Sequence, residues 1–180
     1  MSDAGVSSDE ITGLEPEIVE NDVLTFVTKE QTRFPIQRNL AMTSRLVQKI
    51  LETDRDETVI PLHNVRGEIM DKIITYMRHH MDNPASEIQK PLKSNNMREV
   101  VDDQWDAEFV DVSQDILFEL ILAANYMDVK PLLDLTCAKV ASMLKGKTPE
   151  EIRKKFNIVN DFTPEEEAEV RAENRWADEP

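Results

Sequence analysis

The residue types best suited to metal binding or nucleophilic catalysis are scarce in this chain: His63, His79, His80 and the single Cys137. Two histidines that bind one metal ion from a helix normally lie four residues apart, on the same face. His79 and His80 are adjacent, and adjacent helical residues point about 100° apart. We therefore interpret both as surface or partly packed side chains, and the sequence predicts no metal site.

Cys137 lies in an apolar segment, LLDLTCAKVASML, near which only Lys139 and Lys145 carry positive charge. A catalytic thiol needs a lowered pKa, which requires a more electropositive environment than this one. The four glycines are not spaced as GxGxxG or GxxxxGK, so no phosphate-binding loop is expected. A cofactor-free hydrolase would need a nucleophile, a histidine and an acid to converge without a motif that indicates it. The sequence therefore predicts no catalytic residue, no cofactor and no enzyme activity.

The formal net charge is -15, from 36 acidic against 21 basic residues. Nucleic acids and anionic membranes both attract basic surfaces, so neither is an expected partner. No apolar run approaches the roughly 18 residues of a membrane-spanning helix. A single cysteine excludes an internal disulfide and suits a reducing compartment, so we expect cytoplasmic and nuclear localisation. Residues 1–21 contain six acidic residues and no basic one, which indicates a disordered acidic arm rather than a signal peptide.

Short strands are expected directly after this arm. Residues 23–27 (VLTFV) and 33–37 (RFPIQ) are rich in β-branched and aromatic side chains and are separated by a polar turn. This pattern predicts a β-hairpin. Pro35 cannot donate a backbone hydrogen bond, so the second strand is expected at a sheet edge or in an irregular position. Residues 59–62 (VIPL) predict a third strand.

Helical periodicity appears on both sides of the third strand. The helix before it presents one apolar face, made of Leu46, Val47, Ile50 and Leu51. The helix after it covers residues 67–81. Together with the strands, these helices predict a small mixed α/β unit. Residues 82–105 contain two prolines and a polar SNN, and we interpret them as a mobile connector.

The most apolar segment of the chain follows the connector. Residues 116–128 (ILFELILAANYMD) are apolar nearly all round, which predicts a central helix in the protein interior. Residues 130–144 predict a further helix, with Pro131 in its first turn and Gly146 as its stop. These two helices are expected to supply most of the core of the second half.

Two helix starts are specified by the same four letters, TPEE, at residues 148–151 and 163–166. A residue before proline favours extended backbone, as a helix N-cap requires, and proline suits the first helical position. The glutamate three residues after each threonine can close a capping box, and acidic first turns complement the helix dipole. Each cap contributes about 1 kcal/mol to helix stability.

The segment 148–180 has strong helix signals but little to bury. About a third of its residues are apolar, against nearly two thirds of residues 113–144. Ordering one residue's backbone costs about 1 to 2 kcal/mol, and fully burying a large apolar side chain contributes about 1.5 to 3 kcal/mol. The larger apolar residues are Ile152, Phe156, Ile158, Val159, Phe162, Val170 and Trp176. The segment is therefore either an interface that a partner covers or a marginal structure that folds onto its own core.

Four stretches of the second half resemble the Skp family, the adaptor subunits of SCF (Skp, cullin, F-box) ubiquitin ligases. They are QWDAEF, LFELILAANYMDVKPLLDLTC, KGKTPEEIRKKFNI and NDFTPEEEAEVRAENRW. The resemblance implies an α/β (α+β), mostly helical fold, with a BTB/POZ core over 22–144 and a C-terminal helical extension over 145–180. The similarity upstream is looser, and the acidic arm and the short stretch 53–58 depart from the family pattern.

The resemblance also implies two binding surfaces. Asn125 and Tyr126, at the end of the central helix, would face a cullin. The extension and the helix before it would bind the F-box of a substrate receptor, through Leu133, Cys137, Val140, Ile152, Phe156, Ile158, Phe162, Val170 and Trp176. The implied function is a non-catalytic adaptor that bridges cullin and F-box receptors in ubiquitin-dependent protein degradation. Weak homodimerisation is an option for the free chain.

Other classes of interaction protein remain open on the sequence. One is a self-assembling BTB scaffold or an elongin-C-like subunit, although elongin-C-like chains end near the central helices and this chain continues through Thr148 to Trp176. Another is a partner of F-box proteins in a complex that lacks a cullin. The sequence does not identify the receptors or their substrates.

Overall fold

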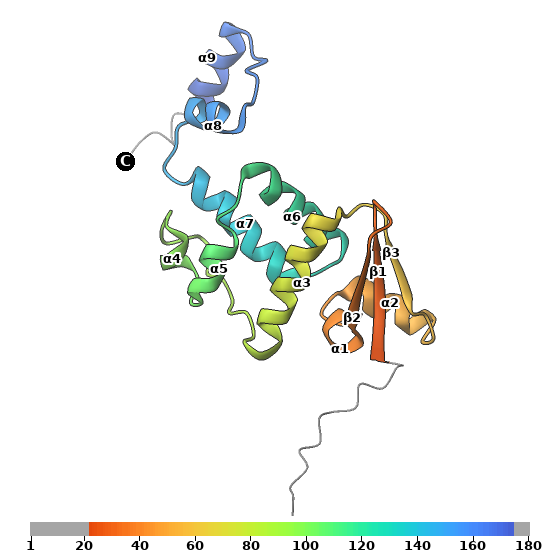
Figure 1. Ribbon diagram of the computed structural model, residues 1–180. Coiled ribbons are helices and arrows are strands. Elements are labelled where there is room, and N and C mark those ends of the chain that lie inside the picture. Colours follow the sequence, from red (N-terminus) through yellow and green to blue (C-terminus); the bar gives the residue numbers. More distant parts are fainter. Residues whose placement is uncertain (1–21, 175–180) are drawn as a thin grey trace, which may run out of the picture.

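The computed structural model describes residues 22–174, so the predicted acidic arm lies outside the described residues. A small β-sheet with two short helices forms one end of the molecule, longer helices form the body, and α8 and α9 stand at the other end (Figure 1). A strand-containing first half is thus followed by a helical second half. This order agrees with the predicted α+β, mostly helical class.

The sheet contains the predicted hairpin and the predicted third strand. β1 (Val23–Thr28) and β2 (Arg33–Gln37) are antiparallel, and β3 (Val59–Leu62) pairs in parallel with the other edge of β1. The strand order is therefore β2-β1-β3. Pro35 lies in the edge strand β2, as predicted, where it breaks no interior ladder. Phe26, in the central strand, is fully buried.

Two helices lie between the hairpin and β3: α1 (Arg38–Ala41) and α2 (Arg45–Thr53). Ser44 caps α2, because its Oγ accepts a hydrogen bond from the Val47 N–H at 3.3 Å. The same hydroxyl donates to the Met127 carbonyl at 2.5 Å, so it links this end of the molecule to the helical body. The sequence predicted α2 but not α1, because a four-residue helix is too short to show periodicity.

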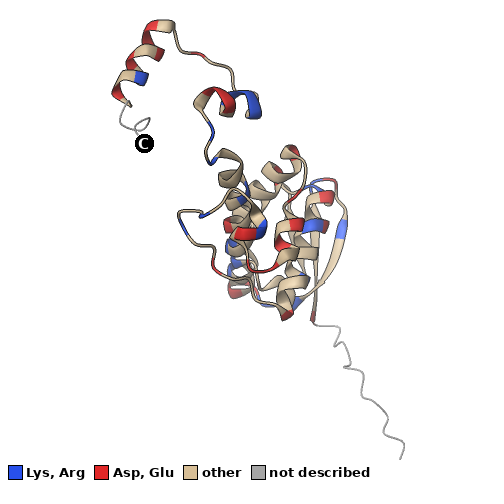
Figure 2. Cartoon of the chain, turned by 90° about the vertical axis from the view of Figure 1, so that its left-hand side faces the viewer, with Lys and Arg blue, Asp and Glu red and all other residues tan. Residues whose placement is uncertain are grey.

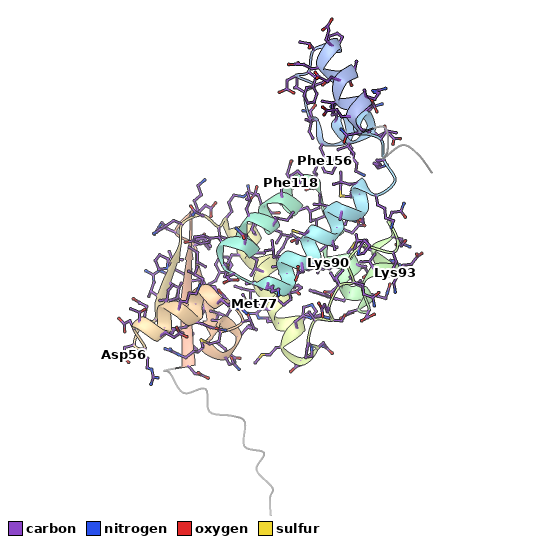
Figure 3. The ribbon with its side chains drawn as sticks, turned by 180° about the vertical axis from the view of Figure 1, so that it is seen from behind. Asp56, Met77, Lys90, Lys93, Phe118 and Phe156 are labelled. Carbon is purple, nitrogen blue, oxygen red and sulfur yellow. The ribbon has the colours of Figure 1, made fainter. Side chains whose placement is uncertain are left out.

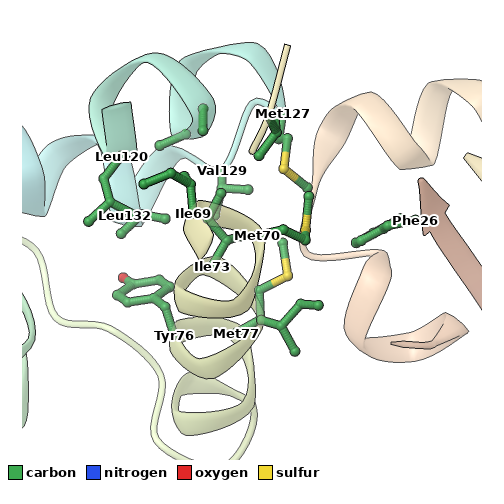
Figure 4. Close-up of a cluster of buried hydrophobic side chains, with 14 of the residues drawn as sticks. Phe26, Ile69, Met70, Ile73, Tyr76, Met77, Leu120, Met127, Val129 and Leu132 are labelled. Carbon is green, nitrogen blue, oxygen red and sulfur yellow. The ribbon is translucent and has the colours of Figure 1, made fainter. Parts of the chain in front are cut away.

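The centre of the core is α3 (Gly67–Asp82). Figure 4 shows Met70 and Met77 on the side of this helix that faces Phe26 of the sheet. The buried side chains on its other side include Ile69, Ile73, Leu120 and Leu132. A helix with apolar residues on two sides can join a sheet layer and a helix layer into one core.

The helical body contains α6 (Gln114–Tyr126) and α7 (Lys130–Leu144), which pack against each other. The turn between them includes Asp128, whose φ of 52° is a left-handed conformation that Asp tolerates. The prediction that the helix at residues 116–128, now α6, lies in the interior was wrong for one of its faces. Phe118 is 37% exposed and Leu122 is 69% exposed, so α6 presents apolar side chains to solvent. Apolar residues all round a helix are also compatible with a face that a partner covers.

The interval 82–105 contains more structure than the word connector suggests. It includes α4 (Met97–Val100) and the start of α5 (Gln104–Phe109). Met97 and Val101 are buried and belong to the core. Both helices are too short to show helical periodicity, so the sequence does not predict them. The mobility of this interval stays a prediction.

The adjacent histidines join α3 to α5. His79 Nε2 lies 2.6 Å from Asp103 Oδ2, and His80 Nε2 lies 2.8 Å from Asp106 Oδ1. The hydrogen bond with His79 lowers the pKa of Asp103, whereas burial raises the pKa of Asp106. The His79 ring also stacks on Trp105, with 3.9 Å between ring centroids. Both histidines are partly packed, as predicted, and they hold α5 against the core.

The extension consists of α8 (Pro149–Phe156) and α9 (Pro164–Glu173), and neither helix has a buried residue. Both predicted capping boxes are present. In the first, Thr148 Oγ1 accepts from the Glu151 N–H at 3.2 Å, and the Glu151 carboxylate accepts from the Thr148 N–H at 2.9 Å. Figure 2 shows the two helices beyond the end of α7, with charged residues along both.

Candidate protein-binding site

An apolar groove lies where α8 meets α6 and the end of α7. It has a volume of about 400 Å³, it is open to solvent, and its lining residues are Phe118, Val140, Leu144, Ile152, Phe156 and Ile158. These residues come from segments that are distant in the sequence. Exposed apolar concavities of this kind are typical of surfaces that receive side chains from another molecule. We call this site the receptor groove.

Two aromatic rings mark the receptor groove. Figure 3 labels Phe118 on α6 and Phe156 at the end of α8. Their ring centroids are 6.0 Å apart and their planes are tilted by 38°, a favourable arrangement for an aromatic pair. This pair is the apolar contact that places α8 beside the body. Because Phe118 is only partly covered, a partner could bury further area on the same ring.

The end of α8 returns the chain to the receptor groove. Asn157 has a φ of 52°, and Asn is one of the few residues that accept this left-handed C-cap position. The next residue, Ile158, donates its N–H to the Arg153 carbonyl at 2.8 Å. The chain therefore turns back at once, and Ile158 lines the groove beside Phe156.

Charged side chains, rather than buried apolar ones, hold α9 to α8. Arg171 pairs with Glu150 at 2.8 Å, and Arg153 pairs with Glu167 at 3.4 Å. None of these side chains is buried, and ion pairs near the surface contribute at most about 1 kcal/mol each. A hollow of about 440 Å³ remains between the two helices, with Val170 in its lining. Within this chain, only weak interactions therefore fix the angle between α8 and α9.

Further apolar side chains lie on the surface of the extension. The Arg153 guanidinium lies 5.8 Å from the centre of the Phe162 ring, within cation–π distance. Even so, Phe162 remains 44% exposed, and Val159 is 82% exposed. Together with Val170, they continue the apolar surface from the receptor groove toward α9. This surface is available to a partner that covers both helices.

The structure brings together only part of the predicted F-box contacts. Four of them line the receptor groove: Val140, Ile152, Phe156 and Ile158. Phe162 and Val170 lie further along the extension, and Trp176 lies outside the described residues. Leu133 packs against the core instead, and Cys137 lines a separate hollow beside the connector.

Two residues of the receptor groove, Phe118 and Leu144, were missed by the sequence analysis. Phe118 follows Leu117, which is buried, so it points away from the core on a helix that looks apolar all round. Its helical position relative to the buried Leu120 and Ala124 was the signal that could have identified it.

The two predicted cullin contacts lie together at the end of α6. Asn125 and Tyr126 are both exposed, and the Asn125 carbonyl accepts the Asp128 N–H at 3.2 Å where the helix ends. One turn earlier, Leu122 is 69% exposed and extends this surface. Phe118, Leu122 and Tyr126 are spaced four residues apart, so they form one stripe along α6. We call it the α6 stripe.

The described residues contain no cluster of three or more His, Cys, Asp or Glu side chains placed to hold a metal ion. Within residues 22–174, no helix has the length and apolar character needed to cross a bilayer. The candidate site consists of apolar surfaces: the receptor groove, the extension and the α6 stripe.

Comparisons with known protein families match both halves of the chain. The family model for the POZ part, described as "Skp1 family, tetramerisation domain", matches residues 22–82. A second model, described as "Skp1 family, dimerisation domain", matches residues 130–177. The first match covers the sheet and α1 to α3, and the second covers α7 and the extension. The predicted family resemblance and the predicted BTB/POZ fold class are both confirmed.

Individual relatives match over most of the chain. A protein of Tetrahymena thermophila named "S-phase kinase-associated protein 1 homolog" is 46% identical over 178 residues, 98% of this chain and 98% of the relative. The "E3 ubiquitin ligase complex SCF subunit sconC" of Aspergillus flavus is 46% identical over 158 residues, 87% of this chain and 96% of that protein. The protein of the same name from Talaromyces stipitatus is 43% identical over 157 residues, 87% of this chain and 97% of its own length.

Proposed function

This chain belongs to the Skp1 family, and we propose that it is the non-catalytic adaptor subunit of an SCF-type E3 ubiquitin ligase. In this role it binds the F-box of a substrate receptor on one surface and a cullin on another. Relatives that carry the name of an SCF subunit support the assignment. The proposal gives the chain no catalytic residue, so its contribution to ubiquitin transfer is to hold the other subunits together.

The observation that carries the F-box part is the receptor groove on an extension without buried residues. A chain segment that exposes this much apolar surface is stabilised when a partner covers it. The capping boxes keep α8 and α9 helical while their apolar side chains remain available. Phe118, Val140, Ile152, Phe156 and Ile158 form the centre of the proposed contact. Phe162, Val170 and Trp176 extend it.

The cullin part rests on the far end of the α6 stripe. Tyr126 follows Phe118 by eight residues, which places it about 12 Å further along the helix axis. Two partners can therefore bind α6 at the same time, one at each end. Asn125, Tyr126 and Leu122 form the proposed cullin contact. We further propose that the chain works in the cytoplasm and nucleus, since its single cysteine suits a reducing compartment.

The F-box surface is tested by calorimetry with an isolated F-box domain. Phe156→Ala removes one of the two rings of the receptor groove, and the expected loss of affinity is about thirtyfold, or about 2 kcal/mol. Val59→Ala is the control, because Val59 is 37% exposed, lies in β3 at the other end of the molecule and does not line the groove. Equal affinities of the two variants would contradict the assignment of the groove.

The cullin surface is tested with the double variant Asn125→Lys and Tyr126→Lys. Two added charges would be desolvated at the cullin interface only, so cullin binding should be abolished while F-box affinity changes less than twofold. Phe156→Ala should show the reverse pattern. Loss of both partners in the lysine variant, with a lowered unfolding temperature, would indicate unfolding instead of a contact.

A further inference from the structure

The contact between α3 and α5 contains two histidine–aspartate pairs with different surroundings. His79 pairs with Asp103 at 2.6 Å, and His80 pairs with Asp106 at 2.8 Å. The side chains of the first pair are partly exposed, whereas those of His80 and Asp106 are only 9% and 7% exposed. The second pair is therefore almost closed to solvent, and each of its polar atoms must find its partner inside the protein.

The other ring nitrogen of His80 fixes where its proton lies. His80 Nδ1 is 2.7 Å from the backbone carbonyl oxygen of Asn83. A carbonyl oxygen only accepts hydrogen bonds, so Nδ1 must carry a proton and donate it to this contact. A neutral imidazole has a single N–H group, so in neutral His80 the second nitrogen, Nε2, is an acceptor.

The contact between His80 and Asp106 consequently needs one more proton. An ionised carboxylate has only acceptor atoms, so neutral His80 and ionised Asp106 would place two acceptors 2.8 Å apart. One proton, on His80 Nε2 or on Asp106 Oδ1, converts this repulsion into a hydrogen bond. Because either atom can carry the proton, it belongs to the pair rather than to one residue.

The neighbouring groups favour retention of this proton. The ring centroids of Tyr76 and Trp105 lie 4.3 and 5.9 Å from that of His80, within the range at which an aromatic ring attracts positive charge. Figure 4 shows the Tyr76 ring on the side of α3 that faces away from the sheet. Burial raises the pKa of Asp106. Burial, followed by the charges of Asp106 and Asp134, also raises the pKa of Tyr76, so this hydroxyl stays neutral.

The adjacent pair needs no extra proton, although it also joins α3 to α5. Within residues 22–174, His79 Nδ1 forms no hydrogen bond that fixes its protonation. A neutral His79 can therefore carry its one proton on Nε2 and donate it to the ionised Asp103. The two pairs thus differ by one proton while they connect the same two helices.

We propose that α5 is held against α3 by one proton that His80 and Asp106 share, and that α5 detaches from α3 when this proton is lost. Without the proton, an ionised carboxylate would stay buried opposite an acceptor, which costs more than its transfer to water. Ala107 and Val110 are buried beside Asp106, so detachment uncovers part of the core. This device goes beyond the proposed function, and its test contains the chain alone.

The pH range of the device follows from the behaviour of an exposed histidine, which loses its proton near pH 6.5. The docked α5 holds the shared proton to a higher pH than the detached helix does. Docking is therefore fully stabilised below about pH 6.5 and weakens as the pH rises beyond it. For one proton, the docking equilibrium constant falls by at most about tenfold per pH unit.

Hydrogen exchange of the unmodified chain measures this detachment. The Val110 N–H donates to the Asp106 carbonyl at 3.2 Å, so its exchange reports the opening of α5. After correction for the intrinsic effect of pH on exchange, its protection should fall about tenfold between about pH 6.5 and 8. The protection of α6 amides should stay constant over the same range.

A pair of matched variants assigns the effect to the shared proton. Asp106→Asn replaces that proton by a permanent amide N–H, which can donate to His80 Nε2 at any pH. Protection of the Val110 amide should then become independent of pH. Asp103→Asn makes the same change in the adjacent pair and should leave the pH dependence in place.

The imidazole ¹⁵N chemical shifts of the unmodified chain test the same point without a substitution. At about pH 6.5 they should show a proton on His80 Nδ1. A neutral His80 with its only proton on Nε2, in a chain whose α5 is protected, would overturn the proposal, because that tautomer needs no shared proton. So would constant protection of Val110 up to about pH 9, or an equal loss of protection in α6, which would indicate global unfolding.

Discussion

The body of the protein and its extension are stabilised in different ways. In the body, α3, α6 and α7 contribute fully buried side chains to one core that also includes the sheet. In the extension, α8 and α9 contribute none, and they depend on capping boxes and on ion pairs that are not buried. The body therefore depends on a shared buried core, whereas the extension depends on helix caps and on ion pairs between its own two helices.

One chain can thus combine a rigid body with an extension whose packing is adaptable. Helices held by caps and surface ion pairs can change their packing at low cost, because no core has to open. Helices held by a common core cannot move separately without exposing apolar surface. If the body and the extension are stabilised separately, substitutions in each should have different effects on binding and on stability.

The largest effect is expected from deletion of residues 148–180. F-box binding should be lost completely, because Ile152, Phe156 and Ile158 of the receptor groove are removed. The body retains every residue of its core, so its unfolding temperature and its cullin affinity should change little. Differential scanning calorimetry and titration calorimetry measure these quantities. If the truncated chain melts or fails to fold, the extension is a structural part of the body and the comparison is wrong.

A core substitution in the body should lower global stability strongly. Leu120→Ala removes a fully buried side chain, and the free energy of unfolding should fall by about 3 kcal/mol in a urea titration. Ile152→Ala in the extension is the control, since no residue of α8 is buried. Its effect on global unfolding should stay below about 0.5 kcal/mol. Similar losses for both variants would show that the extension unfolds together with the core.

The uncovered apolar surface should cause weak self-association of the free chain. Sedimentation should show a monomer–dimer equilibrium with a Kd on the order of 100 µM, typical of a small interface. Replacing Ile158 and Val159 by serine should weaken it severalfold. A strict monomer whose α8 and α9 amides exchange as slowly as those of α6 would contradict this expectation.

The smallest effect should come from acidification below pH 4.5, and it is followed at the start of α9. The Thr163 N–H donates to the Glu166 carboxylate at 2.8 Å and lowers the pKa of Glu166 from its ordinary 4.5. Because the pKa of Glu166 is lower in the folded state, the cap stabilises α9 fully above pH 4.5. This stabilisation is lost as the pH falls below 4.5 through the lowered pKa. Amide chemical shifts of the first turn of α9 measure the change. Glu166→Gln should abolish this pH dependence while the shifts of α6 remain those of the parent chain.

Elements with local signals were the most predictable parts of the molecule. The capping boxes at Thr148 and Thr163 were found because each closes within four residues. The hairpin and its edge proline were found because strand alternation and proline chemistry are also local. In contrast, α4 and α5 were missed, although each has a side-chain cap: Asn96 caps α4 and Asp103 caps α5. Helices this short have no periodic face to recognise.

The sequence predicted the apolar chemistry of the candidate site, but only some of the residues that line it. The apolar residues of the extension predicted either an interface or a segment that folds onto its own core, and the scarcity of reactive side chains pointed away from catalysis. Cys137 and Val140 were expected on one surface, but they line different hollows. They are three residues apart on α7, and only the neighbouring elements decide which side of that helix each hollow occupies.

By itself the sequence determined the family, the types of the strands and longer helices, and the helix starts of the extension. These features depend on residues that are close together, where steric preference and hydrogen bonding act without help from distant parts. Only the tertiary structure decided that Phe118 of α6 meets Phe156 of α8, and that the connector forms a pocket with α7. Contacts across such sequence distances depend on how whole helices pack, since one packing arrangement fixes the position of every side chain on both surfaces.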